Sequence, residues 1–407
     1  MLFDEIINEY YDLGEYPAQA CLTREWSCTR PFDGMNILAA TPIFRNTLVQ
    51  YRMLIAGGAT LYVGRAVGLT SGGEGAATSM PCDPQVIELL QANGIPVVSP
   101  EQVLAAEQQG DFMDFILDCA GQFSACHPRL GFVELTRSGV QFYENAEKPV
   151  YVADSGIVKR IETSLGTGDG YFRALQQLGF IAGTLENSLS PDESASAPAQ
   201  NKLVVFGSGK VGCGIALQGI NRGFNVTTVT DTSRMGSATD FSHVLQMNGV
   251  DVVDFRDYPQ IVALIENADF VVTATGVKNA LARPEITAAL LRTRAVLANM
   301  GVEDEYGADI PAEHVLAKKS PLNFILEEPT HLKYIDASMA LHAALAERLV
   351  QEAGGVVPAE TLTSAERESG PRNPPAELEQ RLLTVTIQNG VVGPEVCGML
   401  GLAPEMD

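Results

Sequence analysis

Residues 201–231 combine residue types that can bind a phosphate with one that can bind a sugar hydroxyl. The apolar run Lys202–Phe206 leads into Gly207-Ser208-Gly209-Lys210-Val211-Gly212, and a β-branched run, Asn225–Thr230, ends on Asp231. In a strand–helix–strand unit such glycines allow a tight turn, close approach of a pyrophosphate and close helix packing, and the helix N-terminus faces the phosphates. Asp231 can accept both hydroxyls of an adenosine ribose and would repel a 2′-phosphate, so the pattern predicts NAD rather than NADP.

The composition excludes several classes of partner. A formal net charge of −23 predicts no nucleic-acid partner and no anionic membrane surface, because phosphate recognition needs clustered Lys and Arg. No apolar run approaches the length of a membrane span, and the first residues lack the basic start of a signal peptide. The cysteines form no C-x-x-C pair and the histidines show no metal-ligand spacing. We therefore expect reduced thiols, a cytoplasmic protein and no metal site.

Strands alternating with helices predict an α/β fold of two doubly wound parallel-sheet, Rossmann-like domains, the second of which binds NAD. We expect a substrate-type domain over residues 1–185, completed by about 340–407, and a Pro/Ser-rich linker at 186–200. The NAD-binding domain is expected over 201–336, followed by a crossing helix and C-terminal segment over 337–407. Strands are predicted at 35–40, 60–63, 96–99, 115–119, 131–135, 150–153, 202–206, 225–230, 250–255, 270–274, 295–300 and 324–326. Helices are predicted at 44–56, 85–92, 337–349 and 375–383, and 354–376 is predicted as a loop.

The order of a substrate-type α/β unit, a linker, an NAD-type unit and a crossing helix resembles adenosylhomocysteinase, and several sequence segments do so as well. They are 269–278, 298–301 and 332–339 in the second domain and, more weakly, 46–49, 55–59 and 152–155 in the first. That family holds NAD permanently and oxidises the 3′-hydroxyl of a bound nucleoside. The resemblance implies NAD, a small-molecule substrate and a homo-oligomer, either a dimer or a tetramer. With the glycine loop it gives these cofactor-binding residues: Gly207, Gly209, Lys210, Val211, Gly212, Asp231, Thr136, Ser138, Thr275, Gly276, Asn299 and Gly301.

Most of the family's catalytic residues have no match in this chain. Residues of other types stand at Pro42, Phe44, Gly73, Leu135, Val302 and Tyr334 where the family has its histidines, threonine, aspartate, glutamate and asparagine. Glu74, next to Gly73, is the nearest carboxylate to the missing aspartate. The family's C-terminal K-x-x-x-Y tail has no counterpart in 390–407, which leaves tight NAD binding and the tetramer open.

Three residues remain as catalytic candidates: Lys159, Asp154 and Glu162. The family's lysine falls on Val158 or, with a one-residue insertion, on Lys159, where a lysine near a buried sheet edge can act as a base. The alternative is a solvated lysine at a helix start. Asp154 ends a strand at the ligand edge of a doubly wound sheet, or else caps a turn. Glu162 replaces a family aspartate in one register, or else is an exposed helix acid.

Three functions are consistent with these residues. The first is an NAD-dependent enzyme of the adenosylhomocysteinase type with a rewritten substrate site, catalysing redox chemistry with or without coupled elimination or hydrolysis. The second is a catalytically inactive NAD-binding regulator or partner protein. The third is an ordinary dehydrogenase with exchangeable NAD. Hydrolysis of adenosylhomocysteine itself is not expected.

Overall fold

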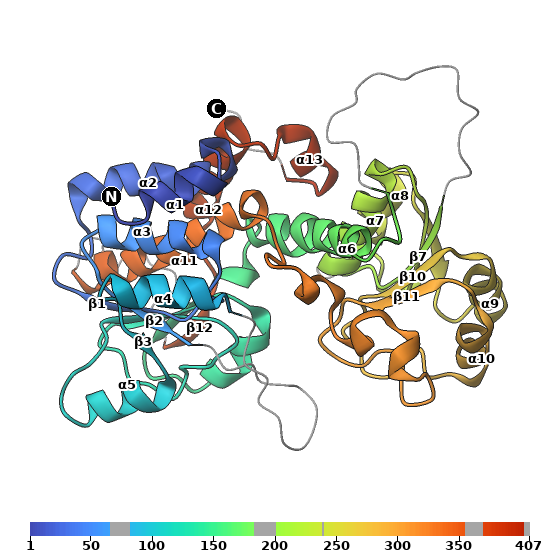
Figure 1. The fold of residues 1–407 in the computed structure, drawn as a ribbon, viewed down its shortest axis with the longest axis horizontal. Coiled ribbons are helices and arrows are strands. Elements are labelled where there is room, and N and C mark those ends of the chain that lie inside the picture. The colour runs from blue at the N-terminus through green and yellow to red at the C-terminus, as the bar shows by residue number, and fades with distance from the viewer. Residues whose placement is uncertain (66–81, 183–200, 238–239, 355–368, 403–407) are drawn as a thin grey trace. The chain divides into compact units, whose positions relative to one another are not determined.

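The computed structural model divides the chain into two compact units (Figure 1). It describes residues 1–65, 82–182, 201–237, 240–354 and 369–402. Unit 1 comprises Met1–Ile161, His331–Gly398 and Leu402–Asp407, and unit 2 comprises Glu162–Thr330 and Met399–Gly401. The predicted linker at 186–200, and Gly73 and Glu74, lie outside the described residues. No helix in the described ranges is long and apolar enough to cross a membrane.

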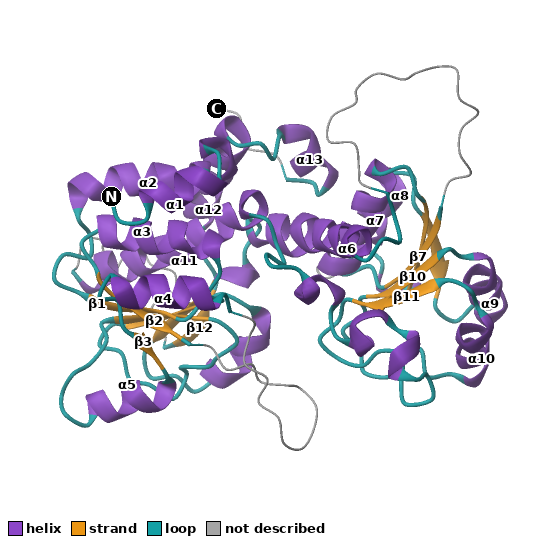
Figure 2. Ribbon diagram, viewed as in Figure 1, coloured by secondary structure: helices purple, strands orange, loops and turns teal. Residues whose placement is uncertain are grey.

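Unit 1 is built on a parallel sheet with strand order β12-β6-β5-β4-β1-β2-β3 among the described residues. Its strands are β1 (Asn36–Ala39), β2 (Thr60–Gly64), β3 (Val97–Val98), β4 (Phe115–Asp118), β5 (Gly131–Glu134), β6 (Pro149–Val152) and β12 (Gly370–Arg372). Its helices are α1 (Asp4–Tyr10), α2 (Pro17–Thr29), α3 (Leu48–Ala56), α4 (Pro84–Ala92), α5 (Pro100–Glu107), α11 (Leu332–Ala353), α12 (Ala376–Asn389) and α13 (Pro394–Met399), whose last residue belongs to unit 2. Figure 2 shows α2, α3, α11 and α12 on one side of this sheet and α5 on the other.

Unit 2 is built on a parallel sheet with strand order β11-β10-β7-β8-β9. Its strands are β7 (Lys202–Phe206), β8 (Asn225–Thr230), β9 (Asp251–Asp254), β10 (Phe270–Thr273) and β11 (Val296–Asn299). Its helices are α6 (Thr167–Gln177), α7 (Lys210–Asn221), α8 (Ser242–Met247), α9 (Tyr258–Asn267) and α10 (Pro284–Arg292). The strands lie between α7 and α8 on one side and α9 and α10 on the other (Figure 2).

Local sequence explains where several of these helices begin. The Asp83 carboxylate accepts the Gln85 N–H at 2.8 Å at the start of α4, and Ser99 and Gln102 form a capping box at the start of α5. Asp257 accepts the Gln260 N–H at 3.1 Å before α9. Each of these helices also has proline in its first turn, where the missing N–H costs nothing.

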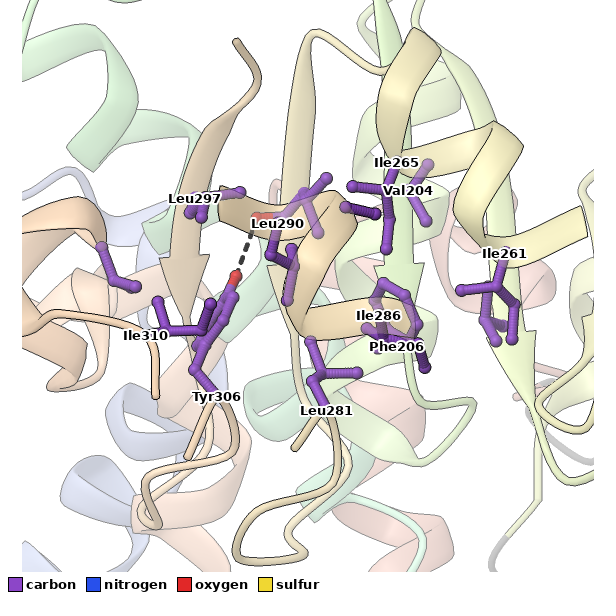
Figure 3. Close-up of a cluster of buried hydrophobic side chains, with 14 of the residues drawn as sticks. Val204, Phe206, Ile261, Ile265, Leu281, Ile286, Leu290, Leu297, Tyr306 and Ile310 are labelled. Carbon is purple, nitrogen blue, oxygen red and sulfur yellow. Dashed lines mark hydrogen bonds between the residues drawn. The ribbon is translucent and has the colours of Figure 1, made fainter. Parts of the chain in front are cut away.

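The core of unit 2 fills the space between the sheet and the helices α9 and α10 (Figure 3). Val204, Phe206 and Val271 from the strands pack with Ile261 and Ile265 of α9 and with Ile286 and Leu290 of α10. Tyr306 is fully buried there, and its hydroxyl donates to the carbonyls of Ala298 (2.9 Å) and Val271 (3.3 Å). The strands are therefore apolar on a face that helices cover, as parallel sheets require.

The structure confirms the predicted fold class and corrects three element predictions. The predicted strand at 324–326 is wrong: Leu322–Ile325 form a 3₁₀ turn with local bonds, such as Leu326 N–H to Asn323 O at 3.2 Å, and Phe324 is half exposed. The predicted loop at 354–376 contains β12, which pairs with β6. The predicted helix at 337–349 extends over Leu332–Ala353. A short apolar run does not distinguish strand from helix, which explains the first error.

Candidate functional site

The glycine-rich loop of unit 2 lies where the strand order of the sheet reverses. β7 pairs with β8 on one side and with β10 on the other, and both neighbours are parallel to it. The carboxyl ends of β7 and β10, at Phe206 and Thr273, are therefore adjacent. In doubly wound sheets, ligands bind at this edge and at this reversal.

Two glycines of this loop are required by its geometry. Gly207 has φ of +112°, and a Cβ on it would lie 2.5 Å from the Ala274 carbonyl oxygen. A Cβ on Gly212 would lie 2.0 Å from the Gly207 carbonyl oxygen. Larger residues cannot occupy either position without moving backbone, because real Cβ atoms do not approach oxygen so closely. The loop thus brings α7 into contact with the strand end, as a dinucleotide fingerprint requires.

Gly209 has a different role, because its backbone does not need glycine. Its φ of −68° and ψ of −175° are extended values that any residue adopts. Gly209 is the residue just before α7, whose first residues are Lys210 and Val211. Because it has no side chain, it supplies no capping acceptor to the first N–H groups of that helix. A residue without a side chain at the start of a 12-residue helix fits the approach of a phosphate to these groups.

A side-chain network that the sequence analysis missed supports the same loop. The Ser208 hydroxyl lies 2.6 Å from the Thr230 hydroxyl and donates to the Asp240 carboxylate, which also accepts the Ser242 hydroxyl. The Phe241 N–H donates to the Ser208 carbonyl at 2.9 Å. The loop is therefore tied to the end of β8 and to the start of α8. No spacing rule links residues 208 and 240, so only the fold could show this.

Asp231 lies at the end of β8, as predicted, and its carboxylate is already engaged. Its Oδ1 accepts the Ser233 hydroxyl (2.5 Å), the Ser233 N–H (3.1 Å) and the Arg256 guanidinium (2.9 Å). The Ser233 hydroxyl bond is the main cause of an Asp231 pKa below its ordinary value, and Arg256 lowers the pKa further. Asp231 is therefore an ionised acceptor at the predicted ribose position.

A buried glutamate organises the predicted Thr275 and Gly276 segment. Glu305 is fully buried, and its carboxylate accepts the Thr275 N–H (2.9 Å), the Thr275 hydroxyl (2.7 Å) and the Gly276 N–H (2.7 Å). Burial raises the pKa of Glu305 against the effect of these donors. The Thr275 hydroxyl therefore faces a protein carboxylate in this structure. Glu305 is not among the site residues predicted from the sequence.

Asn299 and Gly301 form a second support of the same edge. The Asn299 Oδ1 accepts the Thr273 hydroxyl (2.9 Å) and the Gly301 N–H (3.0 Å). Its Nδ2 donates to the carbonyls of Glu303 (2.8 Å) and Lys319 (2.6 Å). Fully buried Asn299 thus joins β10, β11 and the segment that follows them.

The remaining predicted residues divide between the units. Thr136, Ser138, Asp154 and Lys159 belong to unit 1, whereas Glu162 belongs to unit 2, in a π-helical turn before α6. Lys159 is 1% exposed, so it is not a solvated lysine. Asp154 is buried in a single 3₁₀ turn that directly follows β6. The Thr136 hydroxyl donates to Glu134 at 2.7 Å and lies 3.0 Å from the Ser138 hydroxyl.

The carboxyl edge of the unit 1 sheet carries two buried acids that the sequence analysis did not select. Asp118 and Glu134 are opposite each other at the ends of β4 and β5. Asp118 accepts the Tyr143 hydroxyl (2.5 Å) and the N–H groups of Cys119 and Phe123 (both 2.8 Å). Burial and the Glu134 carboxylate raise the pKa of Asp118 to about 7. Burial raises the pKa of Glu134 as well, so the two carboxyl groups form a coupled pair in which burial favours the protonated form.

A buried hydrogen-bond chain runs under the same edge. The Thr41 hydroxyl donates to Gln50 Oε1 (3.2 Å), Gln50 Nε2 lies 3.2 Å from His342 Nδ1, and His342 Nε2 lies 2.9 Å from the Val133 carbonyl. Burial, with a further contribution from the charge of Lys159, lowers the pKa of His342 to about 4. His342 is therefore neutral, with Nε2 protonated so that it donates to Val133.

Comparisons with known proteins give similar structures but no matching family. No family model and no curated protein matches the chain. One of the dipicolinate synthase chains of Bacillus halodurans is similar in structure, with 13% identity, 79% of this chain and 99% of that chain covered, and a TM-score of 0.47. A dipicolinate synthase chain from Bacillus subtilis gives 12% identity, 79% and 98% coverage and a TM-score of 0.43. A transhydrogenase from Sinorhizobium meliloti gives 15% identity, 77% and 94% coverage and a TM-score of 0.42.

Proposed function

We propose that unit 2 binds NAD through residues 207–212 and Asp231, and that the chain is an NAD-dependent oxidoreductase acting on a small-molecule substrate. Bound NAD would accept or supply the hydride. The observation that carries this proposal is the loop at the sheet reversal. A Cβ on Gly207 or on Gly212 would lie only 2.5 or 2.0 Å from a backbone oxygen, and Gly209 precedes α7. A plain glycine turn would explain Gly207, but not Gly209, whose backbone is open to any residue.

For the substrate side we propose Lys159, Asp154 and Glu162 as the groups that move protons. Support comes from the burial of Lys159 and from Asp154 directly after β6, at the edge where doubly wound sheets bind ligands. Thr275, Gly276, Asn299 and Gly301 of unit 2 are proposed for the nicotinamide side, and a nicotinamide-side role for Thr136 and Ser138 of unit 1 stays a prediction. A relationship to adenosylhomocysteinase, a homo-oligomer and a cytoplasmic location stay predictions.

The cofactor proposal is tested by binding, with a variant that adds a methyl group at the position where the pyrophosphate is proposed to approach the loop. Gly209→Ala is compatible with the observed backbone, so the protein should fold and its affinity for NADH should fall about tenfold or more, as the methyl group and pyrophosphate compete. The measurement is calorimetric titration with NADH, together with the absorbance and mass of any molecule that co-purifies. Gly398→Ala, where a Cβ meets nothing within 4 Å, is the control. Wild-type protein that binds neither NAD nor NADH would overturn the proposal.

A second candidate is an NAD-binding regulator without catalysis. The departures from the resembled family at Pro42, Leu135, Val302 and Tyr334 favour it. Purified protein would be offered NAD with cellular metabolites, and reduction would be followed at the nicotinamide absorbance. Turnover with any of them excludes the regulator, and turnover of adenosylhomocysteine or adenosine would also contradict a rewritten substrate site.

A further inference from the structure

The carboxyl ends of β8 and β9 place an arginine beside the predicted ribose acceptor. Thr230 and Asp254 are partners in the parallel register of these strands, and the Phe255 N–H donates to the Thr230 carbonyl at 2.8 Å. Asp231 follows the first of these strands directly, and Arg256 lies two residues beyond the second. The sequence alone does not show this, because residues 231 and 256 belong to different strand ends.

Arg256 bridges two carboxylates at this edge. Its guanidinium lies 2.9 Å from Asp231 Oδ1 and 3.1 Å from Asp254 Oδ2, and it also contacts the Ser233 hydroxyl at 3.3 Å. Its central carbon lies 4.6 Å from the centre of the Phe255 ring. The side chain is nevertheless 52% exposed, so a ligand at this edge can reach it.

The contacts of Asp231 leave one of its oxygens for a ligand. Ser233 and Arg256 donate only to Oδ1, and in the part of the chain that the structure describes no hydrogen bond to Oδ2 is found. Asp231 is 31% exposed. An adenosine ribose that used Oδ2 would therefore have its 2′ position close to the Arg256 guanidinium.

Resting on the proposed binding of NAD, we propose that Arg256 is the specificity-determining partner of Asp231. Paired with Asp231, it holds the carboxylate for the ribose hydroxyls of NAD. Without that carboxylate, its guanidinium binds the 2′-phosphate of NADP, since a planar fork of donors suits phosphate oxygens. The choice between the two cofactors thus depends on the Asp231–Arg256 pair and not on Asp231 alone.

Charge explains why the wild-type site should prefer NAD to NADP. Asp231 and Asp254 together carry two negative charges against one positive charge on Arg256, so the paired site repels a 2′-phosphate. Hydrogen bonds from Ser233 to Asp231 and from Thr232 to Asp254 are the main causes of lowered pKa values for both acids, so both are ionised at neutral pH. Removing the Asp231 charge leaves Arg256 paired with one acid, Asp254, so the positive and negative charges balance.

The test is a double-mutant cycle with Asp231→Asn, Arg256→Gln and the double variant. Affinities for NADH and NADPH are measured by calorimetric titration at one fixed salt concentration, because exposed charges are screened. Asp231→Asn should raise the affinity for NADPH about tenfold or more, as expected for hydrogen bonds to a charged group. Arg256→Gln should weaken NADH binding about two- to fivefold, the range for an exposed ion pair. In the double variant the gain for NADPH should disappear.

Arg292→Gln is the matched control, since Arg292 is an exposed arginine of unit 2 paired with Glu266 at 2.8 Å. It should leave both affinities unchanged. If the double variant binds NADPH as well as Asp231→Asn does, Arg256 is not the phosphate partner and the inference is wrong. If the wild type binds neither dinucleotide, the proposed function itself fails, which is a different result.

Discussion

Buried carboxylates in both units accept backbone N–H groups from loops and helix starts. Glu134 accepts the N–H groups of Ala120 and Gly121 (both 2.9 Å) after β4, and Glu305 accepts those of Thr275 and Gly276 after β10. β4 lies next to β1, the first strand of the unit 1 sheet, and β10 lies next to β7, the first strand of the unit 2 sheet. In both sheets this is the strand at which the strand order has reversed. The same device therefore fixes the corresponding loop in the two units.

Asp336 shows the energetic cost of such a group. It is fully buried in α11 and accepts the N–H groups of Ala18 (2.8 Å) and Gln19 (3.0 Å) at the start of α2. Burial raises its pKa to about 7, from 3.8, although these donors favour the ionised form. Between these pH values the folded state binds a proton that the unfolded state has released, so stability falls as pH rises through this window.

We predict that Asp336→Asn removes part of the pH dependence of stability. The stability advantage of the wild type over the variant should decrease by up to about 1.4 kcal/mol per pH unit between about pH 4 and 7, then stay constant. Urea titrations at several pH values measure it, followed by fluorescence of Trp26, the only tryptophan, which is buried in α2. The exposed Asp111→Asn should give no such trend. A constant difference for Asp336→Asn would show that this carboxyl titrates normally.

At the level of single residues, the sequence predicted positions that follow a local pattern and missed those that meet only in the fold. The glycine loop and Asp231 lie within one strand–helix–strand unit, where spacing carries the information. Asp240 and Arg256 contact that unit from outside it, and Glu305 contacts Thr275 and Gly276 after β10, and no spacing rule connects these residues. For Lys159 the sequence allows either a base or a solvated lysine, and its burial excludes the second alternative.

At the level of elements, both sheets share one strand order around a first strand. Unit 1 has β3-β2-β1-β4-β5-β6 and adds β12, and unit 2 has β9-β8-β7-β10-β11. The sequence predicted the main strands because parallel strands read as short apolar runs. It missed β12, whose Gly-Pro-Arg sequence has no such run and which, among the described strands, pairs with β6 alone. Pro371 in this strand suits a sheet edge, where a missing N–H is tolerated.

The packing of α7 inside unit 2 gives a prediction at the same scale. A Cβ on Gly214 would lie 1.8 Å from the Ser164 carbonyl oxygen, whereas a Cβ on Gly219 would meet only side-chain ends, at 3.0 Å or more. Both substitutions by alanine gain about 1 kcal/mol of helix propensity. We expect Gly219→Ala to be near neutral and Gly214→Ala to destabilise unit 2 by about 1–3 kcal/mol net, because backbone must move.

Urea unfolding followed by far-ultraviolet circular dichroism compares these two variants in one helix. Equal stability would show that the segment before α6 shifts without cost, contrary to the prediction. The NADH affinity of Gly214→Ala is a second readout, because Gly214 lies in α7, the helix that begins at the glycine loop.

At the level of the whole molecule, the two units have separate cores, and only unit 2 is proposed to bind the dinucleotide. A ligand that binds one folded unit stabilises that unit alone, so a single melting temperature does not describe the chain. At a free NADH concentration 100 times its dissociation constant, the gain is about 2.7 kcal/mol. For a unit of this size, that gain corresponds to a shift of roughly 5–10 °C.

We therefore expect scanning calorimetry to show two transitions, of which NADH raises one by roughly 5–10 °C. Trp26 identifies the other, because it is the only tryptophan and lies in unit 1, where its Nε1 donates to Glu347 at 3.0 Å. The melting temperature that Trp26 fluorescence reports should stay unchanged with NADH. Gly209→Ala, which should weaken NADH binding about tenfold or more, should reduce the shift of the other transition to about half or less. An equal shift of both transitions, or a shift of the Trp26 transition alone, would contradict binding through the glycine loop of an independently folding unit 2.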